Sequence, residues 1–337
     1  MRDYYIFKSG RISRHENTIE IEYSDGKKSI PINDVRSLHI FGEIDLNTKL
    51  IVFLNQHGIP IHFYNYYGYY SGSFYPREKL VSGFLLIKQV EHYINTTKRL
   101  YIAKEFVNTA IYNILANLRH YIKTGKDVKK FIDTINDELL RLKVDISNIN
   151  IAELMGIEGR CREHYYSSFD VILRDEFKFE RRSRMPPTNM LNSMISFGNS
   201  LLYTTILNEI YHTQLNPTIS YLHEPSERRF SLALDISEIF KPIIVDRIIF
   251  NLVNNRKIGE EYFIEELNGC YLNEKGKRLF VDEYQKKLST TIRHSKLNRH
   301  VSYNKLIRLE CYKLIKHLLG SVNLRASITK LYYAINT

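Results

Sequence analysis

The stretch Tyr66-Tyr67-Gly68-Tyr69-Tyr70-Ser71-Gly72-Ser73, with Pro76 shortly after it, divides the chain into two parts with different hydrophobic patterns. Glycine, serine and proline collect in turns and linkers rather than in regular elements. Upstream of this break apolar residues tend to alternate with polar ones, and downstream they recur every three or four positions. The change predicts a first domain over residues 1–75, a linker over 76–84 and a second domain over 85–337.

The first part has the pattern of β-strands. In Ile19-Glu20-Ile21-Glu22-Tyr23 apolar and polar residues alternate, as in a half-buried strand, and Asp25-Gly26 supplies a hairpin turn. One short helix is predicted from about Asn47, its N-cap, to Gln56, with Gly58 as the stop signal. Several short strands at this spacing predict a small β-sandwich or barrel, of which we expect the sandwich. The further strands are expected over 29–32, 35–40 and 59–64.

The second part has the pattern of helices. From Leu85 to Ile94 and from Ile102 to Leu118, apolar residues recur with a period of 3.6. The fold class predicted from the two patterns is α+β, with a small N-terminal β-sandwich domain followed by a larger helical domain. Further helices are expected near 127–143, 148–177, 189–213, 236–255 and 299–334.

Composition and charge favour a folded protein with a polyanionic partner. Of the 337 residues, 44% are hydrophobic and 25% are charged, which excludes a disordered, collagen-like or low-complexity chain. Lys and Arg number 48 against 37 Asp and Glu, so the net charge is +11. Residues 293–317 hold seven of these cations against Glu310 alone. Such a tract is either a solvated helix face or a track for a phosphate backbone.

Cysteine usage and hydropathy indicate the compartment. Cys161, Cys270 and Cys311 are too few and too scattered for a disulfide framework or a CxxC zinc site, so a reducing cytosol is the simplest setting. The N-terminal residues 1–10 contain no apolar signal-peptide core. No apolar run approaches the roughly 18 residues that a membrane span needs. We therefore expect a cytoplasmic protein without a membrane partner.

Three segments carry groups that could bind a metal ion. Glu158 lies between Gly156 and Gly159, and glycine within a helical pattern suggests close packing or close approach of a ligand. His223 lies between a helix and a turn, and Asp235 and Glu238 are three residues apart, so that a helix presents both on one face. Each has a simpler interpretation: a surface glutamate, an exposed histidine, and an N-cap with a first-turn acid.

Taken together, these residues form a ligand set of carboxylates and one imidazole without a thiolate. Such a set suits the hard ions Mg²⁺ or Mn²⁺. Two arginine-rich pieces, 160–162 and 181–184, lie between the segments, and the planar guanidinium matches phosphate geometry. The candidates for contacts with a nucleic-acid backbone are Arg162, Arg181, Arg184, Arg293, Lys296 and Arg299.

The order of the motifs is the most specific signal in the sequence. They are Gly156-Ile157-Glu158-Gly159, Arg184-Met185-Pro186-Pro187-Thr188-Asn189, Asn192-Ser193-Met194-Ile195-Ser196-Phe197-Gly198-Asn199-Ser200-Leu201-Leu202, Leu222-His223-Glu224-Pro225 and Leu234-Asp235-Ile236-Ser237-Glu238-Ile239-Phe240-Lys241-Pro242. This series resembles the Cas1 family of CRISPR-associated integrases. The resemblance extends to Tyr271-Leu272-Asn273-Glu274-Lys275-Gly276 and to Phe7-Lys8-Ser9-Gly10-Arg11-Ile12-Ser13-Arg14, so it covers nearly the whole chain.

The resemblance implies an N-terminal β-sandwich that dimerises and an all-helical catalytic domain. It implies a homodimer that assembles with the small Cas2 protein and inserts new spacers into a CRISPR array. The metal ligands of the family correspond to Glu158, His223 and Glu238, with Asp235 in support. Glu238 stands where relatives often have Asp. The segment Arg160-Cys161-Arg162-Glu163 stands where they usually have small residues before an aromatic.

The activity that the resemblance implies is metal-dependent transesterification, in which a 3′-hydroxyl of a spacer-precursor duplex attacks a phosphodiester of the CRISPR repeat. Three other interpretations remain open from the residues alone. The protein could be a DNA-binding structural protein whose acids are helix caps, a phosphodiesterase of small nucleotides, or a nuclease that cuts DNA without joining it.

Overall fold

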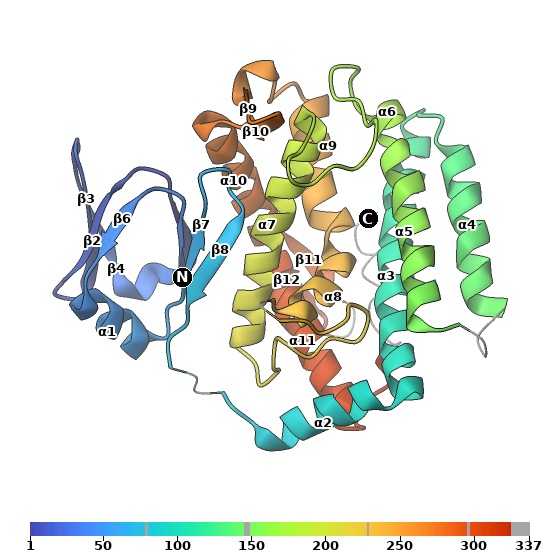
Figure 1. Ribbon diagram of the computed structural model, residues 1–337, viewed down its shortest axis with the longest axis horizontal. Coiled ribbons are helices and arrows are strands. Elements are labelled where there is room, and N and C mark those ends of the chain that lie inside the picture. Colours follow the sequence, from blue (N-terminus) through green and yellow to red (C-terminus); the bar gives the residue numbers. More distant parts are fainter. Residues whose placement is uncertain (78–79, 145–148, 228, 295–296, 325–337) are drawn as a thin grey trace.

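The computed structural model describes residues 1–77, 80–144, 149–227, 229–294 and 297–324. Its N-terminal part contains sheets, and its larger C-terminal part is mostly helical (Figure 1). The predicted α+β class is therefore confirmed. Within the described residues, no helix is both long enough and apolar enough to cross a membrane.

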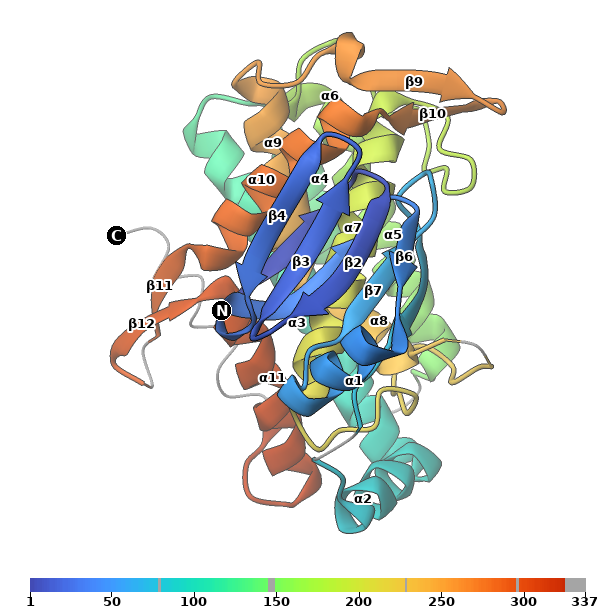
Figure 2. The same ribbon diagram turned by 90° about the vertical axis from the view of Figure 1, so that its left-hand side faces the viewer.

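Two four-stranded sheets make up the N-terminal part. One has the strand order β1-β5-β7-β8, in which β1, β5 and β7 are parallel and β8 is antiparallel to β7. The other has the order β4-β3-β2-β6 and faces the viewer in Figure 2. The strands are β1 (Arg2–Ile6), β2 (Gly10–His15), β3 (Thr18–Tyr23), β4 (Gly26–Pro31), β5 (Val35–Ile40), β6 (Ile44–Leu46), β7 (Ile61–Tyr64) and β8 (Tyr70–Phe74).

The alternating pattern of β3 explains the small core between these sheets. Ile19 and Ile21 are buried in it, whereas Glu20 and Glu22 between them are not. Helix α1 (Thr48–His57) closes the core, as the sequence predicts. The Asn47 side chain accepts a hydrogen bond from the Leu50 amide at 2.9 Å and caps the helix, and Gly58 ends it in the left-handed conformation at φ 68°.

Part of the stretch rich in Tyr, Gly and Ser is a strand rather than a linker. Tyr70–Phe74 forms β8, which bonds to β7. The Tyr70 amide donates to Ser200 Oγ at 3.0 Å, and its ring lies 5.4 Å from that of Tyr203. These partners lie on α7, far along the chain, so local composition does not reveal the strand.

The helical part is arranged around α7, which lies beside the N-terminal sheets (Figure 1). Most of α7 is buried, as expected for a helix with apolar residues on all sides. At Gly198 a Cβ would lie 2.6 Å from Val245 Cγ1, so only glycine permits this approach to the segment after α8. The helices are α2 (Gly83–Ile94), α3 (Thr96–Lys123), α4 (Lys129–Val144), α5 (Ile151–Ser167), α6 (Phe169–Ile172), α7 (Met190–Tyr211), α8 (Ser231–Phe240), α9 (Arg247–Asn254), α10 (Glu274–Ser289) and α11 (Tyr303–Leu318).

The structure corrects two predictions for the second domain. The helix expected over 236–255 is divided into α8, a π-helical segment (Pro242–Asp246) and α9, because Pro242 has no amide proton for a continuous helix. The domain is also not all-helical. Short hairpins form from β9 (Phe263–Glu266) with β10 (Gly269–Leu272) and from β11 (Thr291–His294) with β12 (Arg299–Ser302). Strands of four residues are too short for periodicity to identify.

A buried ionic network joins the two parts of the chain. Arg36 on β5 donates to Asp3 Oδ1 at 2.8 Å and reaches Glu209 Oε1 of α7 at 3.3 Å. Arg308 of α11 donates to the other oxygen of Glu209 at 2.6 Å. Burial raises the pKa of Asp3, but Arg36 outweighs burial and lowers this pKa from 3.8 to about 2.

We expect Arg36→Met to lower the free energy of unfolding by about 3–5 kcal/mol at pH 7, because it leaves the buried carboxylate of Asp3 without its cation. The ion pair stabilises the fold fully above pH 4, and its contribution is lost as pH falls through about 2. The difference between the two proteins should therefore shrink between pH 4 and pH 2.

Urea denaturation across this pH range measures the effect. Lys8→Met is the control, since Lys8 and Asp25 form an exposed pair that water and salt screen, and its loss should change stability little. Equal losses of stability in the two variants would contradict the role assigned to Arg36.

Candidate metal centre

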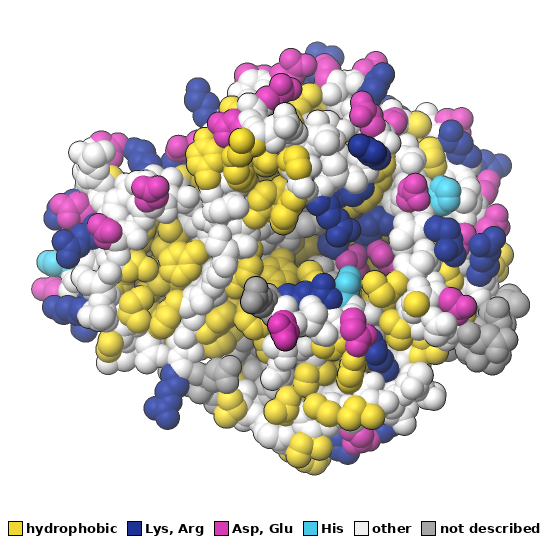
Figure 3. All heavy atoms as spheres, in the orientation of Figure 1, with side chains coloured by type: hydrophobic (Ala, Val, Ile, Leu, Met, Phe, Trp, Pro, Cys, Tyr) yellow, Lys and Arg dark blue, Asp and Glu magenta, His cyan; other side chains and the backbone are white. Residues whose placement is uncertain are grey.

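Glu158, His223 and Glu238 line one cavity of about 1350 Å³. Glu158 lies on α5, His223 on the loop before α8, and Glu238 on α8. Figure 3 shows a hollow in the middle of one face of the molecule, where basic, acidic and histidine side chains gather. The fold thus brings α5, α8 and the loop before α8 to the same cavity.

Helix α5 presents Glu158 from a firmly capped start. The Asn150 side chain accepts from the Glu153 amide at 3.0 Å, and the Glu153 carboxylate accepts from the Asn150 amide at 2.9 Å, which is a capping box. From the sequence, the flanking glycines indicated either close packing or close approach of a ligand. Close packing is not found at Gly159. A Cβ on Gly159 would meet no atom within 4 Å, so this side of Glu158 opens onto the cavity.

The simpler interpretation of Asp235 as an N-cap is wrong, because α8 begins at Ser231 and places this residue inside the helix, fully buried. Its Oδ2 accepts from the amides of Tyr221 and Leu222 at 2.6 and 3.0 Å. Its Oδ1 accepts from the amide and from Nδ1 of His223, at 2.9 and 2.8 Å. One carboxylate therefore fixes both the loop and the imidazole.

The bond to Asp235 also fixes the chemistry of His223. A carboxylate only accepts hydrogen bonds, so Nδ1 carries a proton, and in the neutral imidazole Nε2 then holds the lone pair. A histidine that donates one ring N–H to a carboxylate and offers its other nitrogen is the arrangement that metal ligands adopt in proteins.

Two cations neutralise the carboxylates. Arg162 Nε donates to Glu158 Oε1 at 2.7 Å, and Arg162 Nη2 donates to Glu238 Oε2. Lys241 Nζ donates to Glu238 Oε1 at 2.5 Å. Burial raises the pKa of Glu238, but Lys241 and Arg162 outweigh burial and lower it to about 2, so the group is ionised at neutral pH.

The donor chemistry of this cavity fits Mg²⁺ or Mn²⁺, which prefer carboxylate oxygens and accept imidazole. The arrangement of the side chains is less open to such an ion. In the described part of the chain, no three His, Cys, Asp or Glu residues are grouped closely enough to hold a metal. The guanidinium of Arg162 bonds to both carboxylates, so a shared cation would compete with it for their oxygens.

The predicted contacts with nucleic acid fall into three groups. Arg181 and Arg184 line the cavity of the three candidate ligands. Arg162 lines it too, but its bonds go to the carboxylates. Arg293 and Arg299 lie on the β11–β12 hairpin and do not line the cavity, and Lys296 lies outside the described residues. No comparison tests these as DNA contacts, and they stay predictions.

Sequence reasoning missed the role of Lys241 and the bridging position of Arg162. Spacing could have indicated both, because Lys241 follows Glu238 by three residues and Arg162 follows Glu158 by four. The contact of Arg162 with Glu238 joins two helices, however, and no local pattern indicates it.

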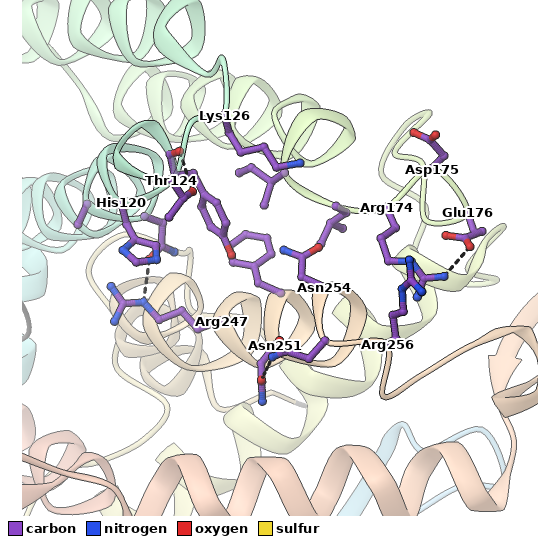
Figure 4. A pocket seen from close by; sticks show the side chains of 17 residues that line it. His120, Thr124, Lys126, Arg174, Asp175, Glu176, Arg247, Asn251, Asn254 and Arg256 are labelled. Carbon is purple, nitrogen blue, oxygen red and sulfur yellow. Dashed lines mark hydrogen bonds and ion pairs between the residues drawn. The ribbon is translucent and has the colours of Figure 1, made fainter.

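A second cavity, of about 970 Å³, lies between the end of α3, the segment after α6, and α9 (Figure 4). It shares no lining residue with the first. Its cations are partly engaged: Arg174 pairs with Glu176 at 2.5 Å, and Arg247 donates to Asn117 at 2.8 Å. The candidate metal ligands therefore belong to the first cavity alone.

The comparisons with known proteins all indicate the same family. The family model described as CRISPR associated protein Cas1 matches residues 4–286. A curated relative from Thermodesulfovibrio yellowstonii, named CRISPR-associated endonuclease Cas1 3, is 55% identical over 95% of this chain and 97% of its own length. The solved structure of a Cas1 protein from Thermotoga maritima is 47% identical, with a TM-score of 0.84 over 95% of this chain and 97% of that one.

More distant structures share the fold. A casposase bound to its integration product has a TM-score of 0.84 at 22% identity, over 100% of this chain and 96% of that one. A chain of a Cas6-RT-Cas1–Cas2 complex has a TM-score of 0.83 at 16% identity, over 97% of this chain and 36% of that one. At these identities the similarity concerns the fold alone.

We expect Asp235→Asn to destabilise the protein by about 3 kcal/mol or more, because the new amide NH₂ would face buried N–H donors and leave them without an acceptor. Thermal unfolding followed by circular dichroism measures the change. The control is Glu224→Gln on the same loop, whose carboxylate is 64% exposed and should contribute about 1 kcal/mol at most. A similar melting temperature for Asp235→Asn and the parent would contradict the anchoring role.

Proposed function

This chain belongs to the CRISPR-associated Cas1 family, and on that premise we propose that it is a metal-dependent DNA endonuclease and integrase of CRISPR adaptation. In the proposed reaction, a DNA 3′-hydroxyl attacks a phosphodiester of the CRISPR repeat and joins a new spacer to it. The observation that carries this proposal is the convergence of Glu158, His223 and Glu238 on one cavity that Arg181 and Arg184 also line.

The residues of the cavity divide into two roles. Glu158, Glu238 and Nε2 of His223 would hold Mg²⁺ or Mn²⁺, and Asp235 keeps the imidazole in the tautomer that leaves Nε2 free. When bound, the ion polarises a phosphodiester oxygen and stabilises the negative charge that develops on it. Arg181 and Arg184 would bind neighbouring phosphates and orient the strand.

The proposed partners are a spacer-precursor duplex, the CRISPR repeat, a second copy of the chain and Cas2. The net charge of +11 supports a nucleic-acid partner. Helix α2 exposes Phe84, Ile87 and Ile94, each more than 60% accessible, and an exposed apolar face of this kind supports a protein partner. The similar fold of the chain in the Cas6-RT-Cas1–Cas2 complex agrees with assembly with Cas2. We assign dimerisation to the N-terminal sheets, residues 1–75.

A strand-transfer assay tests the proposal. Purified protein is mixed with a labelled duplex bearing free 3′-hydroxyls and a supercoiled plasmid carrying a CRISPR repeat, with Mn²⁺, Mg²⁺ or EDTA, and with or without Cas2. We expect the labelled duplex to be joined to the plasmid with Mn²⁺ or Mg²⁺ and not with EDTA. His223→Ala should lower joining by about 100-fold or more while leaving DNA affinity within about threefold, because it removes a metal ligand and no phosphate contact.

His57→Ala is the control, since this exposed histidine lies on α1 in the N-terminal part. It should join DNA at the parent's rate. Binding without joining in either metal would indicate a structural DNA-binding protein, and cleavage without joining would indicate a nuclease. Either outcome would contradict the integrase activity.

A further inference from the structure

Arg162 occupies an unusual position for an arginine on a DNA-processing protein. Its side chain is only 13% exposed, and its guanidinium bonds to carboxylates from two different helices. Glu158 precedes it by one turn on α5, whereas Glu238 comes from α8. A single planar group thus holds the two helices together at the carboxylates that the proposed function assigns to the metal.

Electrostatics explains why a cation is needed there. Glu238 is 6% exposed and Glu158 19%, so their charges are poorly screened by water. Two like charges brought together in a protein interior repel each other strongly unless a positive charge lies between them. Lys241 serves Glu238 alone, through Oε1. Only Arg162 contacts both carboxylates among the ion pairs of the described residues.

A divalent cation and this guanidinium need the same oxygens. Arg162 and Lys241 use both oxygens of Glu238, and Arg162 uses Oε1 of Glu158. A metal ion shared by the two carboxylates would also place two further positive charges beside the arginine. Both arguments make the bridging position of Arg162 and a metal shared by Glu158 and Glu238 compete with each other.

The interior beside Arg162 contains a third carboxylate, that of Asp246. Both of its oxygens are buried and neither is in a well-formed hydrogen bond, and the groups that act on it are Tyr165, Arg162 and Lys241. Burial raises the pKa of Asp246 to about 7, and of the surrounding charges that of Arg162 opposes this rise most. Asp246 is therefore a third carboxylate within electrostatic reach of the guanidinium.

We propose that Arg162 is an internal cation that holds Glu158 and Glu238 together, competes with the divalent ion for them, and moves toward Asp246 when the ion binds. This inference rests on the proposed metal site. It extends that proposal, because Arg162 would lower the affinity of the site for the divalent ion.

Calorimetric titration of the purified full-length protein with Mn²⁺ tests the inference without an activity readout. Arg162→Met keeps the aliphatic stem and removes the competing charge, so it should bind Mn²⁺ about tenfold more tightly than the parent. Arg160→Met is the matched control. Arg160 lies on the same helix and pairs with Glu138 at 2.8 Å, but it does not line the cavity. Its affinity for Mn²⁺ should equal that of the parent.

Two further variants make the titration decisive. Arg162→Lys keeps a charge that can reach only one carboxylate at a time, and it should bind Mn²⁺ severalfold more tightly than the parent even if Arg162→Met does not fold. Asp246→Asn removes the second position for the guanidinium. Asp246→Asn should weaken Mn²⁺ binding when Arg162 is present. The same substitution should weaken binding less in the Arg162→Met protein.

The outcomes separate this inference from the proposed function. Glu158→Gln should abolish the binding heat, which assigns it to this cavity. If the parent binds Mn²⁺ through Glu158 but the Arg162 variants bind equally or more weakly, the competition is refuted and the metal site stands. If Asp246→Asn has the same effect in both backgrounds, the movement toward Asp246 is refuted. If neither the parent nor any variant binds Mn²⁺, the metal site itself fails, and the inference with it.

Discussion

Two carboxylates that meet in a protein interior need a cation between them, and this requirement governs the arrangement of the cavity. Glu158 and Glu238 come from helices distant in sequence, and Arg162 joins them while Lys241 adds a second charge on Glu238. The four groups link α5 to α8 at the cavity where the proposed chemistry takes place. The acids that the proposed reaction assigns to a divalent ion are thus paired with Arg162 and Lys241, and the ion would compete with these side chains for them.

A second carboxylate prepares the histidine. Asp235 lies inside α8 and accepts hydrogen bonds from three consecutive loop amides and from the imidazole of His223. The loop before α8 therefore takes its shape from a buried acid on the helix that follows it. Two acids three residues apart on α8 therefore have different roles. Glu238 lines the cavity, and Asp235 binds the loop.

The fold class could be predicted from the sequence because it depends on local patterns, whereas the candidate metal ligands came from the resemblance of the motif order to a known family. The alternation in Ile19–Tyr23 and the two ends of α1 can be predicted from neighbouring residues. The order of the motifs identified Glu158, His223 and Glu238, which line one cavity. What could not be predicted depends on contacts between distant segments. Strand β8 is held by β7 and α7, the four hydrogen-bond donors to Asp235 lie on another segment, and the bridge from Arg162 to Glu238 crosses between helices.

The most direct test of this account is the crystal structure of the protein grown with Mn²⁺, with the ion located by its anomalous scattering. The account predicts one manganese peak within coordination distance of Glu158, Glu238 and Nε2 of His223, with the Arg162 guanidinium withdrawn from both carboxylates. A cavity without a manganese peak, in crystals grown at a concentration that supports strand transfer, would contradict it. So would an ion bound elsewhere while Arg162 still bridges the two acids.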